Sequence, residues 1–484
     1  MTATQDTPTL TNPNADSASS STIETLPAGG FDPHHFDWAE AWHPVHYVED
    51  LDKSRPTRFT LLEQDLVIWW DPQDEAWRVF RDQCPHRLAP LSEGRVNEAG
   101  HLECPYHGWA FSGDGRCHVI PQAPPESTAT DSPRACAQSL PTAVRQGLLF
   151  VYPGSAENAP QVSVPIIEPM ESDSDGWVLL STFRDLPYDA LTLLENVLDS
   201  SHIPYTHHKS VGNRSNAGPM VDLDILESSK QGFHGTWPEG PRRGKLGQQY
   251  TTFVAPNLMW HDVTSQQFGR TLTVVYATPI RKGECRLFAR FPFKFNSKLP
   301  GLFIKLTPRW YTHIGNNGVL EDDQIFLHLQ ERALAARNGE ESYAQTCYLP
   351  TAGDRFVLEF RRWIDTYSAD PFPGESLPPA WSQSELLDRY RSHTRHCGSC
   401  RPALQRIQKI QRGALVVGAI ALALFPLLVA LGAPLLIAGI TCSVIPILSG
   451  ALWLWLHRLE KQFYQGRAVP PRNLPERSAP QKST

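Results

Sequence analysis

"CPHRLAPLSEGRV", residues 84–96, and "LECPYHGWAFSGDGRC", residues 102–117, decide the fold of the N-terminal part of this chain. Each segment carries one cysteine close to one histidine, and the four residues are Cys84, His86, Cys104 and His107. Zinc sites commonly pair cysteine with cysteine and histidine with histidine. Mixed loops suit a two-iron cluster whose cysteines hold one iron and whose histidines hold the other. The spacing therefore predicts a [2Fe–2S] cluster on these side chains, with tetrahedral zinc as the alternative.

Short apolar runs surround both loops. "DLVIWW" (65–70), "WRVFRD" (77–82) and "LLFVY" (148–152) alternate in a way that predicts short strands. Pro85 and Pro105 follow the two cysteines and stiffen the loops. We therefore expect a small β-sandwich with a Rieske-type cluster at its tip. Because histidine ligation raises the potential of such a cluster, it should act as an electron relay.

"ENVLDSSHIPYTHH", residues 195–208, indicates a second metal site. His202 and His207 are five positions apart, so on an unbroken helix they would point away from each other. Pro204 is expected to end the helix and turn the chain, which lets both imidazoles converge. Two histidines and one carboxylate on one face of an iron are typical of non-haem Fe(II) oxygenases.

Acidic residues complete this predicted site. Asp199 lies three residues before His202, where its carboxylate could accept a hydrogen bond from a ligand imidazole. "VLEDDQIFLHLQ", residues 319–330, offers the third ligand; we prefer Asp323, with Asp322 as the alternative. Two simpler explanations stay open: acids are favoured in the first turn of a helix, and Asp199 could cap a turn beside surface histidines.

Residues 413–456 form a run of 44 positions without a formal charge. Two spans of about 20 residues fit that length, with a turn at Gly432–Pro434. Basic residues flank both ends: Arg406, Lys409, Arg412, Arg458, Lys461 and Arg467. This pattern predicts a membrane hairpin whose two ends face the cytoplasm, with a buried soluble helix pair as the alternative.

Composition bounds the remaining functions. The 484 residues carry a net charge of −7, which gives no case for nucleic-acid binding. Residues 1–30 are rich in Ser, Thr, Asn and Pro and are predicted to be disordered. They lack the features of a secretory or organellar leader, so we expect a protein that stays on the cytoplasmic side. Nine cysteines, an odd count, favour metal or redox chemistry over a disulfide framework.

With these residues assembled, the chain resembles the Rieske non-haem iron oxygenases, and within them the pheophorbide a oxygenase group. That group includes protochlorophyllide-dependent oxygenases, a Rieske protein of the chloroplast inner-envelope translocon and cyanobacterial homologues. The resemblance covers residues 36–460. The motifs that carry it are the two cluster loops, "IPQ", "ENVLDSSHIPYTHH", "PRWYTHIGNN" and "HCGSC", followed by the apolar hairpin.

The resemblance implies an α+β protein with a Rieske β-sandwich, a helix-grip catalytic domain and a C-terminal two-helix transmembrane hairpin. In a helix-grip fold an antiparallel sheet wraps a long helix around an apolar pocket. The implied divisions are a disordered segment 1–35, a Rieske domain 36–154, a catalytic domain 155–365, a linker 366–412, the hairpin 413–456 and a basic tail 457–484.

The resemblance also implies cofactors and partners. One [2Fe–2S] cluster would sit on the four loop residues, and one mononuclear Fe(II) on His202, His207 and an acid. Asp199 would link the two centres between neighbouring subunits of a ring-shaped homotrimer. A ferredoxin would supply electrons, since the sequence has no G-x-G-x-x-G nucleotide loop for its own reductase. Dioxygen and a lipophilic tetrapyrrole would be the substrates, at a thylakoid or plasma membrane.

"HTRHCGSC", residues 393–400, places Cys397 and Cys400 just before the apolar run. The resemblance implies a redox-regulatory dithiol that thioredoxin reduces. His393 and His396 lie close in sequence, so a zinc or iron site is one alternative, and an inert cysteine pair is another.

Two other functions compete with a tetrapyrrole oxygenase. One is a Rieske oxygenase acting on another hydrophobic small molecule, such as an aromatic or isoprenoid compound. The other is a non-catalytic membrane redox sensor. A sensor would have no need of the second metal site, so His202 and His207 favour an enzyme.

Overall fold

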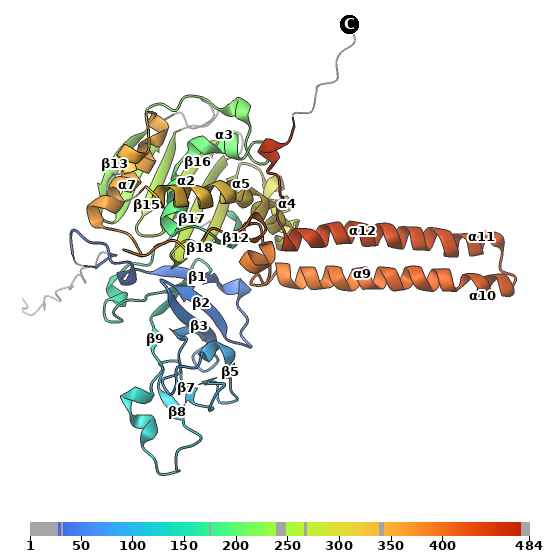
Figure 1. The fold of residues 1–484 in the computed structure, drawn as a ribbon, viewed down its shortest axis with the longest axis horizontal. Coiled ribbons are helices and arrows are strands. Elements are labelled where there is room, and N and C mark those ends of the chain that lie inside the picture. Colours follow the sequence, from blue (N-terminus) through green and yellow to red (C-terminus); the bar gives the residue numbers. More distant parts are fainter. Residues whose placement is uncertain are drawn as a thin grey trace, which may run out of the picture.

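The computed structural model describes residues 28–30, 32–173, 176–238, 248–265, 269–337 and 343–475. Most of the predicted disordered segment 1–35, and residues 476–484 of the predicted basic tail, lie outside these ranges. The described residues form an α+β fold with three parts: a β-sandwich, a large antiparallel sheet with helices on one face, and a projecting helical hairpin (Figure 1). The predicted fold class is confirmed.

The N-terminal domain consists of small antiparallel sheets with strand orders β1-β11-β10, β2-β3-β4-β9 and β5-β6-β7-β8. Their bounds are β1 His43–Tyr47, β2 Thr57–Leu61, β3 Gln64–Asp71, β4 Ala76–Arg81, β5 Arg95–Val96, β6 Leu102–Glu103, β7 Ala110–Phe111, β8 Cys117–Val119, β9 Ser139–Leu140, β10 Thr142–Arg145 and β11 Leu148–Val151. Strands β3, β4 and β11 confirm the three predicted apolar runs. The small sheet β5–β8 lies at the end of the domain that is far from the large sheet (Figure 1).

The large sheet is antiparallel throughout, in the order β12-β18-β17-β16-β15-β14-β13. Its strands are β12 Val178–Leu186, β13 Asp224–Ser229, β14 Gly232–Trp237, β15 Gln249–Val254, β16 Leu258–Ser265, β17 Gly269–Arg281 and β18 Glu284–Phe295. Side chains alternate between its two faces. On β17, Val275 and Ala277 join one apolar cluster, whereas Val274 and Tyr276 join another on the opposite face. Both faces are therefore covered.

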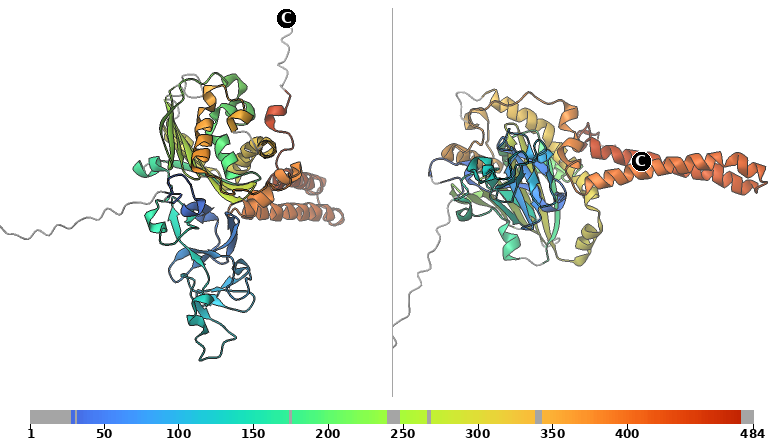
Figure 2. Two further views of the ribbon diagram at one scale, coloured as in Figure 1. Left: turned by 60° about the vertical axis from the view of Figure 1, so that its left-hand side comes forward. Right: turned by 90° about the horizontal axis from the view of Figure 1, so that it is seen from below.

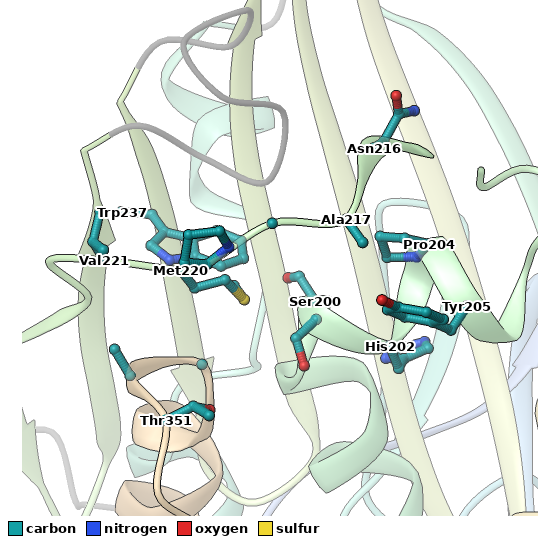
Figure 3. A pocket seen from close by; sticks show the side chains of 15 residues that line it. Ser200, His202, Pro204, Tyr205, Asn216, Ala217, Met220, Val221, Trp237 and Thr351 are labelled. Atoms are coloured by element: carbon teal, nitrogen blue, oxygen red, sulfur yellow. The ribbon is translucent and has the colours of Figure 1, made fainter. Parts of the chain in front are cut away.

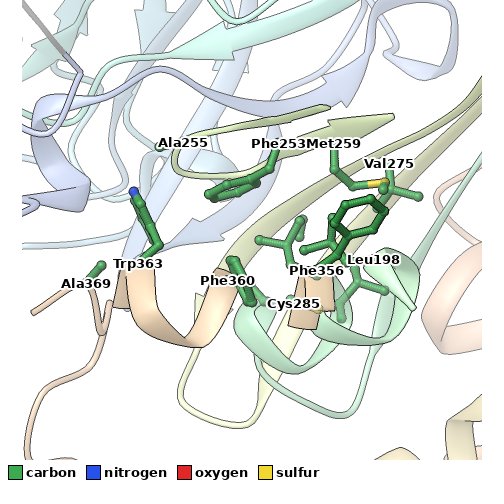
Figure 4. Close-up of a cluster of buried hydrophobic side chains, with 14 of the residues drawn as sticks. Leu198, Phe253, Ala255, Met259, Val275, Cys285, Phe356, Phe360, Trp363 and Ala369 are labelled. Carbon is green, nitrogen blue, oxygen red and sulfur yellow. The ribbon is translucent and has the colours of Figure 1, made fainter. Parts of the chain in front are cut away.

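Three helices cover one face of this sheet: α2 Ala190–Leu198, α5 Arg309–Ala335 and α7 Arg355–Tyr367 (Figures 1 and 2). Phe356, Phe360 and Trp363 of α7 pack between the sheet and α2, against residues that include Phe253 and Leu198 (Figure 4). Shorter helices connect these elements: α1 Glu168–Ser172, α3 Ile203–Thr206, α4 Lys298–Leu306, α6 Tyr343–Thr346 and α8 Gln383–Leu386. This arrangement is the predicted helix-grip fold.

The C-terminal hairpin consists of α9 Cys400–Ala423, α10 Phe425–Ala430, α11 Leu435–Gly439, a π-helical turn Ile440–Val444 and α12 Ile445–Tyr464. Two stretches, Cys400–Ala430 and Leu436–Tyr464, are long and apolar enough to cross a membrane by length and composition. The predicted turn is present, and Gly432 takes a positive φ of 70° there. The helices start before residue 413 and continue past residue 456, so most of the predicted basic flanks lie on them. The hairpin projects away from both domains (Figure 2).

A buried ion-pair cluster joins the base of the hairpin to the large sheet and α5. Arg184 of β12 lies 2.8 Å from Glu321 of α5, and Arg389 contacts the same carboxylate at 2.6 and 2.7 Å. All three side chains are buried. Burial acts to raise the pKa of Glu321, but the two arginines outweigh it and hold that pKa below its usual range. The charges are therefore paired and hydrogen-bonded, as buried charges must be.

Candidate metal centres

The two cluster loops have the same backbone conformation. The backbone carbonyls of Cys84 and Cys104 each accept a hydrogen bond from the amide four residues later. The donors are Leu88, at 2.8 Å, and Gly108, at 3.1 Å. Both of those later residues have a positive φ, 61° and 73°. Each cysteine amide in turn donates across its own loop, to the carbonyl of Ala89 or Trp109. The two motifs thus build two matching loops that face each other at the tip of the domain.

The cysteine pair is buried and the histidine pair is nearer the surface. Cys84 and Cys104 are 1% and 3% exposed, while the rings of His86 and His107 are half-buried with centroids 4.5 Å apart. His86 stacks on Trp109 at 4.8 Å, and its buried Nδ1 has no hydrogen-bond partner among the described residues. Burial raises the pKa of Cys84 to about 12, so its thiolate needs a nearby cation. The four residues fit a cluster held by thiolates inside and imidazoles outside.

The second segment bends at a different place from the predicted one. Helix α2 ends at Leu198, a 3₁₀ turn covers Ser200–His202, and α3 begins at Ile203. Pro204 lies in the first turn of α3, where its missing N–H costs no hydrogen bond. The prediction that Pro204 ends the helix is therefore wrong. The two consecutive short turns still place His202 and His207 together, with ring centroids 5.3 Å apart.

His202, His207 and Asp323 form a compact group whose potential ligand atoms all lie within 4.8 Å of one another. Asp323 Oδ2 lies 3.3 Å from His207 Nε2, and Oδ1 lies 3.8 Å from His202 Nε2. Oδ1 is buried and has no hydrogen-bond partner among the described residues. Burial raises the pKa of Asp323, and the two imidazoles oppose that effect. Two imidazole nitrogens beside a carboxylate form the donor set that is typical of non-haem Fe(II) sites.

The neighbouring acid, Asp322, has a different partner. Its Oδ2 lies 3.3 Å from His207 Nδ1 and accepts a 2.6 Å hydrogen bond from Ser210 Oγ. It therefore holds the back of the imidazole whose Nε2 faces Asp323. Both acids lie in the middle of α5, which begins at Arg309, so the helix dipole does not explain them.

Asp199 does not hold a ligand imidazole through its carboxylate. Its Oδ1 accepts a 2.7 Å hydrogen bond from the backbone amide of Ser201 and so caps the 3₁₀ turn. His202 Nδ1 instead donates to the backbone carbonyl of Asp199. The predicted hydrogen bond exists, but the main chain accepts it. His208, which the sequence left unassigned, accepts a hydrogen bond at Nδ1 from the amide of Arg214.

Two cavities meet at His202 and Pro204. The first, of about 550 Å³, reaches His207 and Asp323 and is lined by apolar strand residues that include Val275, Leu287 and Phe291. The second, of about 770 Å³, lies on the other side of the segment, where Met220 and Trp237 face it (Figure 3). A mainly apolar cavity beside a three-residue metal group suits the binding of a hydrophobic small molecule.

Cys397 and Cys400 lie far from this centre, at the base of the hairpin, and both are buried. Their sulfur atoms group with ring nitrogens of His393 and His313. A hydrogen bond from the Cys400 thiol lowers the pKa of Cys397, although burial opposes the shift. His396 is not part of the group, since its ring accepts a hydrogen bond from Arg395. Sequence reasoning missed His313, which lies 80 or more positions from the other members.

Comparison with known proteins gives consistent matches. Residues 41–142 match the Rieske [2Fe-2S] domain, and residues 253–341 match the family Pheophorbide a oxygenase. A chloroplastic pheophorbide a oxygenase from Oryza sativa is 40% identical over 81% of this chain and 79% of its own length. The protochlorophyllide-dependent translocon component 52 from Arabidopsis thaliana is 34% identical, with coverages of 78% and 75%. Flavonoid 8-hydroxylase 2 from Ocimum basilicum is 33% identical, with coverages of 89% and 85%.

Solved structures share the fold. Dicamba monooxygenase bound to dicamba aligns with a TM-score of 0.53 and 20% identity, over 67% of this chain and 96% of that one. NdmB of Pseudomonas putida CBB5 aligns with a TM-score of 0.53 and 22% identity, over 68% and 90%. At this level of identity the likeness concerns the arrangement of the two domains and their sheets.

Proposed function

Since the chain belongs to the pheophorbide a oxygenase family of Rieske non-haem iron oxygenases, we propose that it oxygenates a chlorophyll-derived tetrapyrrole with dioxygen and ferredoxin-derived electrons. The family carries a [2Fe–2S] cluster and a mononuclear non-haem iron. The observation that carries the proposal is the metal group of His202, His207 and Asp323 at the wall of an apolar cavity.

Two sets of residues would hold the metals: Cys84, His86, Cys104 and His107 for the cluster, and His202, His207 and Asp323 for the iron. When bound, these groups supply electron relay and dioxygen activation. The protein's own contribution is orientation. Asp322 accepts from Nδ1 of one imidazole, and the Asp199 carbonyl accepts from Nδ1 of the other, so both Nε2 atoms face Asp323.

The cavity wall positions the substrate and excludes water. Apolar strand residues such as Val275, Leu287 and Phe291 line the cavity together with His202, His207 and Asp323. A lipophilic ring held there would place one edge beside His202, His207 and Asp323 while its body displaces water. Remote contacts with the wall would thus supply the positioning on which the reaction depends.

Another hydrophobic substrate is the second candidate. A relative named flavonoid 8-hydroxylase 2 is 33% identical over most of both chains, so related sequences serve a different ring system. A purely sensory role is less well supported, because it gives no reason for a metal group with an unpartnered carboxylate oxygen.

We also propose membrane anchoring and a ring-shaped homotrimer. The outer faces of α9 and α12 expose apolar side chains, among them Val416, Ile420, Leu448 and Trp455. Within one chain, the small sheet β5–β8 that borders the cluster loops lies at the opposite end from α2 and α3 (Figure 1). A trimer would bring the tip of one subunit against Asp199 of the next. Which membrane is involved, and a catalytic body on its cytoplasmic side, stay predictions.

The test uses the full chain, purified in detergent with its iron, together with ferredoxin and its reductase. We expect oxygen uptake that depends on one pigment of a tetrapyrrole panel and an oxygenated product in the mass spectrum. His207→Ala should abolish uptake, whereas the adjacent control His208→Ala should keep most of it. Uptake on flavonoids but on no tetrapyrrole would replace the proposed substrate, and uptake that survives His207→Ala would refute the assigned centre.

A further inference from the structure

Four side chains converge in a buried position between the catalytic domain and the hairpin. His313 comes from α5, His393 from the π-helical turn Tyr390–Thr394, Cys397 from the loop that follows it, and Cys400 from the first residue of α9. The two histidines are 0% exposed, and the two cysteines are 0% and 1% exposed. Their potential ligand atoms all lie within 4.8 Å of one another. The oxygenation chemistry uses none of them.

The hydrogen bonds on the outer side of each imidazole define which nitrogen faces inward. His313 Nε2 lies 2.9 Å from the carbonyl of Ser181, and His393 Nδ1 lies 2.7 Å from the carbonyl of Phe183. A carbonyl can only accept, so both of these nitrogens carry the proton. In the neutral imidazoles the other two nitrogens are therefore lone-pair acceptors, yet they face each other at 3.0 Å. Two acceptors at that distance need a cation between them.

The sulfur–nitrogen distances suit one tetrahedral ion. Cys397 Sγ lies 3.4 Å from His313 Nδ1, and Cys400 Sγ lies 3.5 Å from His313 Nδ1 and 3.3 Å from His393 Nε2. With Zn–S of about 2.3 Å and Zn–N of about 2.0–2.1 Å, tetrahedral ligand atoms are roughly 3.3–3.8 Å apart. The arrangement differs from that of the Rieske loops, where the two cysteines lie inside and the two histidines lie outward.

Charge and local backbone agree with a bound divalent cation. Two thiolates and two neutral imidazoles neutralise a divalent ion, which a fully buried site requires. The amides of Ser399 and Cys400 both point at Cys397 Sγ, each at 3.4 Å. The Gly398 amide donates to Asp50 at 2.7 Å, and Arg309 pairs with that same carboxylate. The turn is therefore held in place from the N-terminal domain as well.

We propose that His313, His393, Cys397 and Cys400 bind one structural zinc ion that joins α5 to the first turn of the hairpin. All four coordination positions are taken by protein atoms, and closed sites of this kind stabilise structure rather than catalyse. Binding releases the thiol protons to solvent. This role differs from the predicted thioredoxin-reducible dithiol, and it does not depend on the substrate proposed above.

The test measures metal in the full-length protein purified in detergent without added zinc. Elemental analysis should find one zinc per chain in addition to iron. X-ray absorption at the zinc edge should show two sulfur neighbours at about 2.3 Å and two nitrogen neighbours at about 2.0–2.1 Å. This measurement needs no variant, so it does not depend on whether substituted proteins fold.

Variants and thiol labelling locate the ion. Cys400→Ser and His313→Gln should lose the zinc while keeping the Rieske electron-paramagnetic signal, and the nearby control His396→Ala should keep both. Under native conditions a maleimide should label the exposed Cys136 at once but reach Cys397 only after chelator treatment. A wild-type protein without zinc, or a Cys397–Cys400 disulfide in the untreated protein, would overturn the proposal. Equal zinc loss in the control variant would do so too.

Discussion

Adjacent acids on α5 should respond very differently to the same substitution. Asp323 places a carboxylate oxygen that has no hydrogen-bond partner among the described residues beside His202 and His207, whereas Asp322 contacts the outer nitrogen of His207 and the Ser210 hydroxyl. Replacing either acid by asparagine keeps the size of the side chain and removes its charge. Asp323→Asn removes the anionic ligand itself. Asp322→Asn leaves the ligand set complete and only weakens the hold on one imidazole.

The geometry sets the size of each effect. Loss of an outer hydrogen-bond partner of a metal-bound histidine typically costs about 10–100-fold in metal affinity. The His207–Asp322 contact is long, at 3.3 Å, and Ser210 shares the same oxygen at 2.6 Å. The asparagine amide oxygen can still accept one of these hydrogen bonds. Asp322→Asn should therefore lower the affinity for iron about tenfold, or about 1.4 kcal/mol. Asp323→Asn should lower the affinity for iron by more than about 100-fold, since it removes a proposed direct ligand.

The assay is a chelator titration of the purified protein, with iron counted per chain. The Rieske signal serves as an internal reference, because the four residues proposed to hold the cluster lie in the N-terminal domain. The mononuclear iron should be lost at the lowest chelator concentration in Asp323→Asn, at a higher one in Asp322→Asn and at the highest one in the parent protein. The reverse order of the two variants, or equal retention in both, would refute the division of roles between the acids.

Three further outcomes follow from other parts of the fold. Glu321→Gln leaves two buried arginines with a neutral partner, so it should destabilise the catalytic domain by about 3–5 kcal/mol, measured as a lower melting temperature. Burial raises the pKa of Glu331 to about 7 from an ordinary 4.5. The contribution of Glu331 to stability is therefore full below pH 4.5 and is lost as the pH rises through about 7. The substituted glutamine carries no such charge, so the melting temperature of Glu331→Gln should rise relative to that of the parent as the pH increases from about 5 to 8. A double change of Val416 and Ile420 to lysine, each costing about 2.5–3.5 kcal/mol at a span centre, should abolish flotation with lipid vesicles.

Local patterns predicted three strands of the N-terminal domain because short apolar runs are typical of strands buried on both faces, and β11 is buried throughout while β3 is buried at Leu66–Trp69. Strands β3, β4 and β11 fall where the runs "DLVIWW", "WRVFRD" and "LLFVY" lie. The hairpin turn could also be predicted from the sequence, since Gly432 and Pro434 interrupt an uncharged run. In the structure Gly432 takes the positive φ that such a turn needs. In both cases the signal lies within a few neighbouring residues.

Contacts between distant segments could not be predicted from such local patterns. His313 joins Cys397 and Cys400 only because α5 and α9 meet at the base of the hairpin, and no spacing rule spans 80 positions. Asp199 shows a different limit: the pattern located the hydrogen bond to His202, but not that the main chain accepts it. Side-chain and backbone oxygens of one residue are indistinguishable in a sequence.

One helix, α5, carries one residue of each proposed metal centre in the C-terminal half of the chain. His313 faces the hairpin cluster and Asp323 faces the iron group, ten positions along an uninterrupted helix. That spacing corresponds to about 15 Å of helical rise. In a membrane-anchored molecule α5 would therefore hold the proposed oxygenation centre at a fixed distance from the base of the hairpin. Substrates would then be selected first by how far they extend out of the bilayer and only afterwards by how well they fit the cavity.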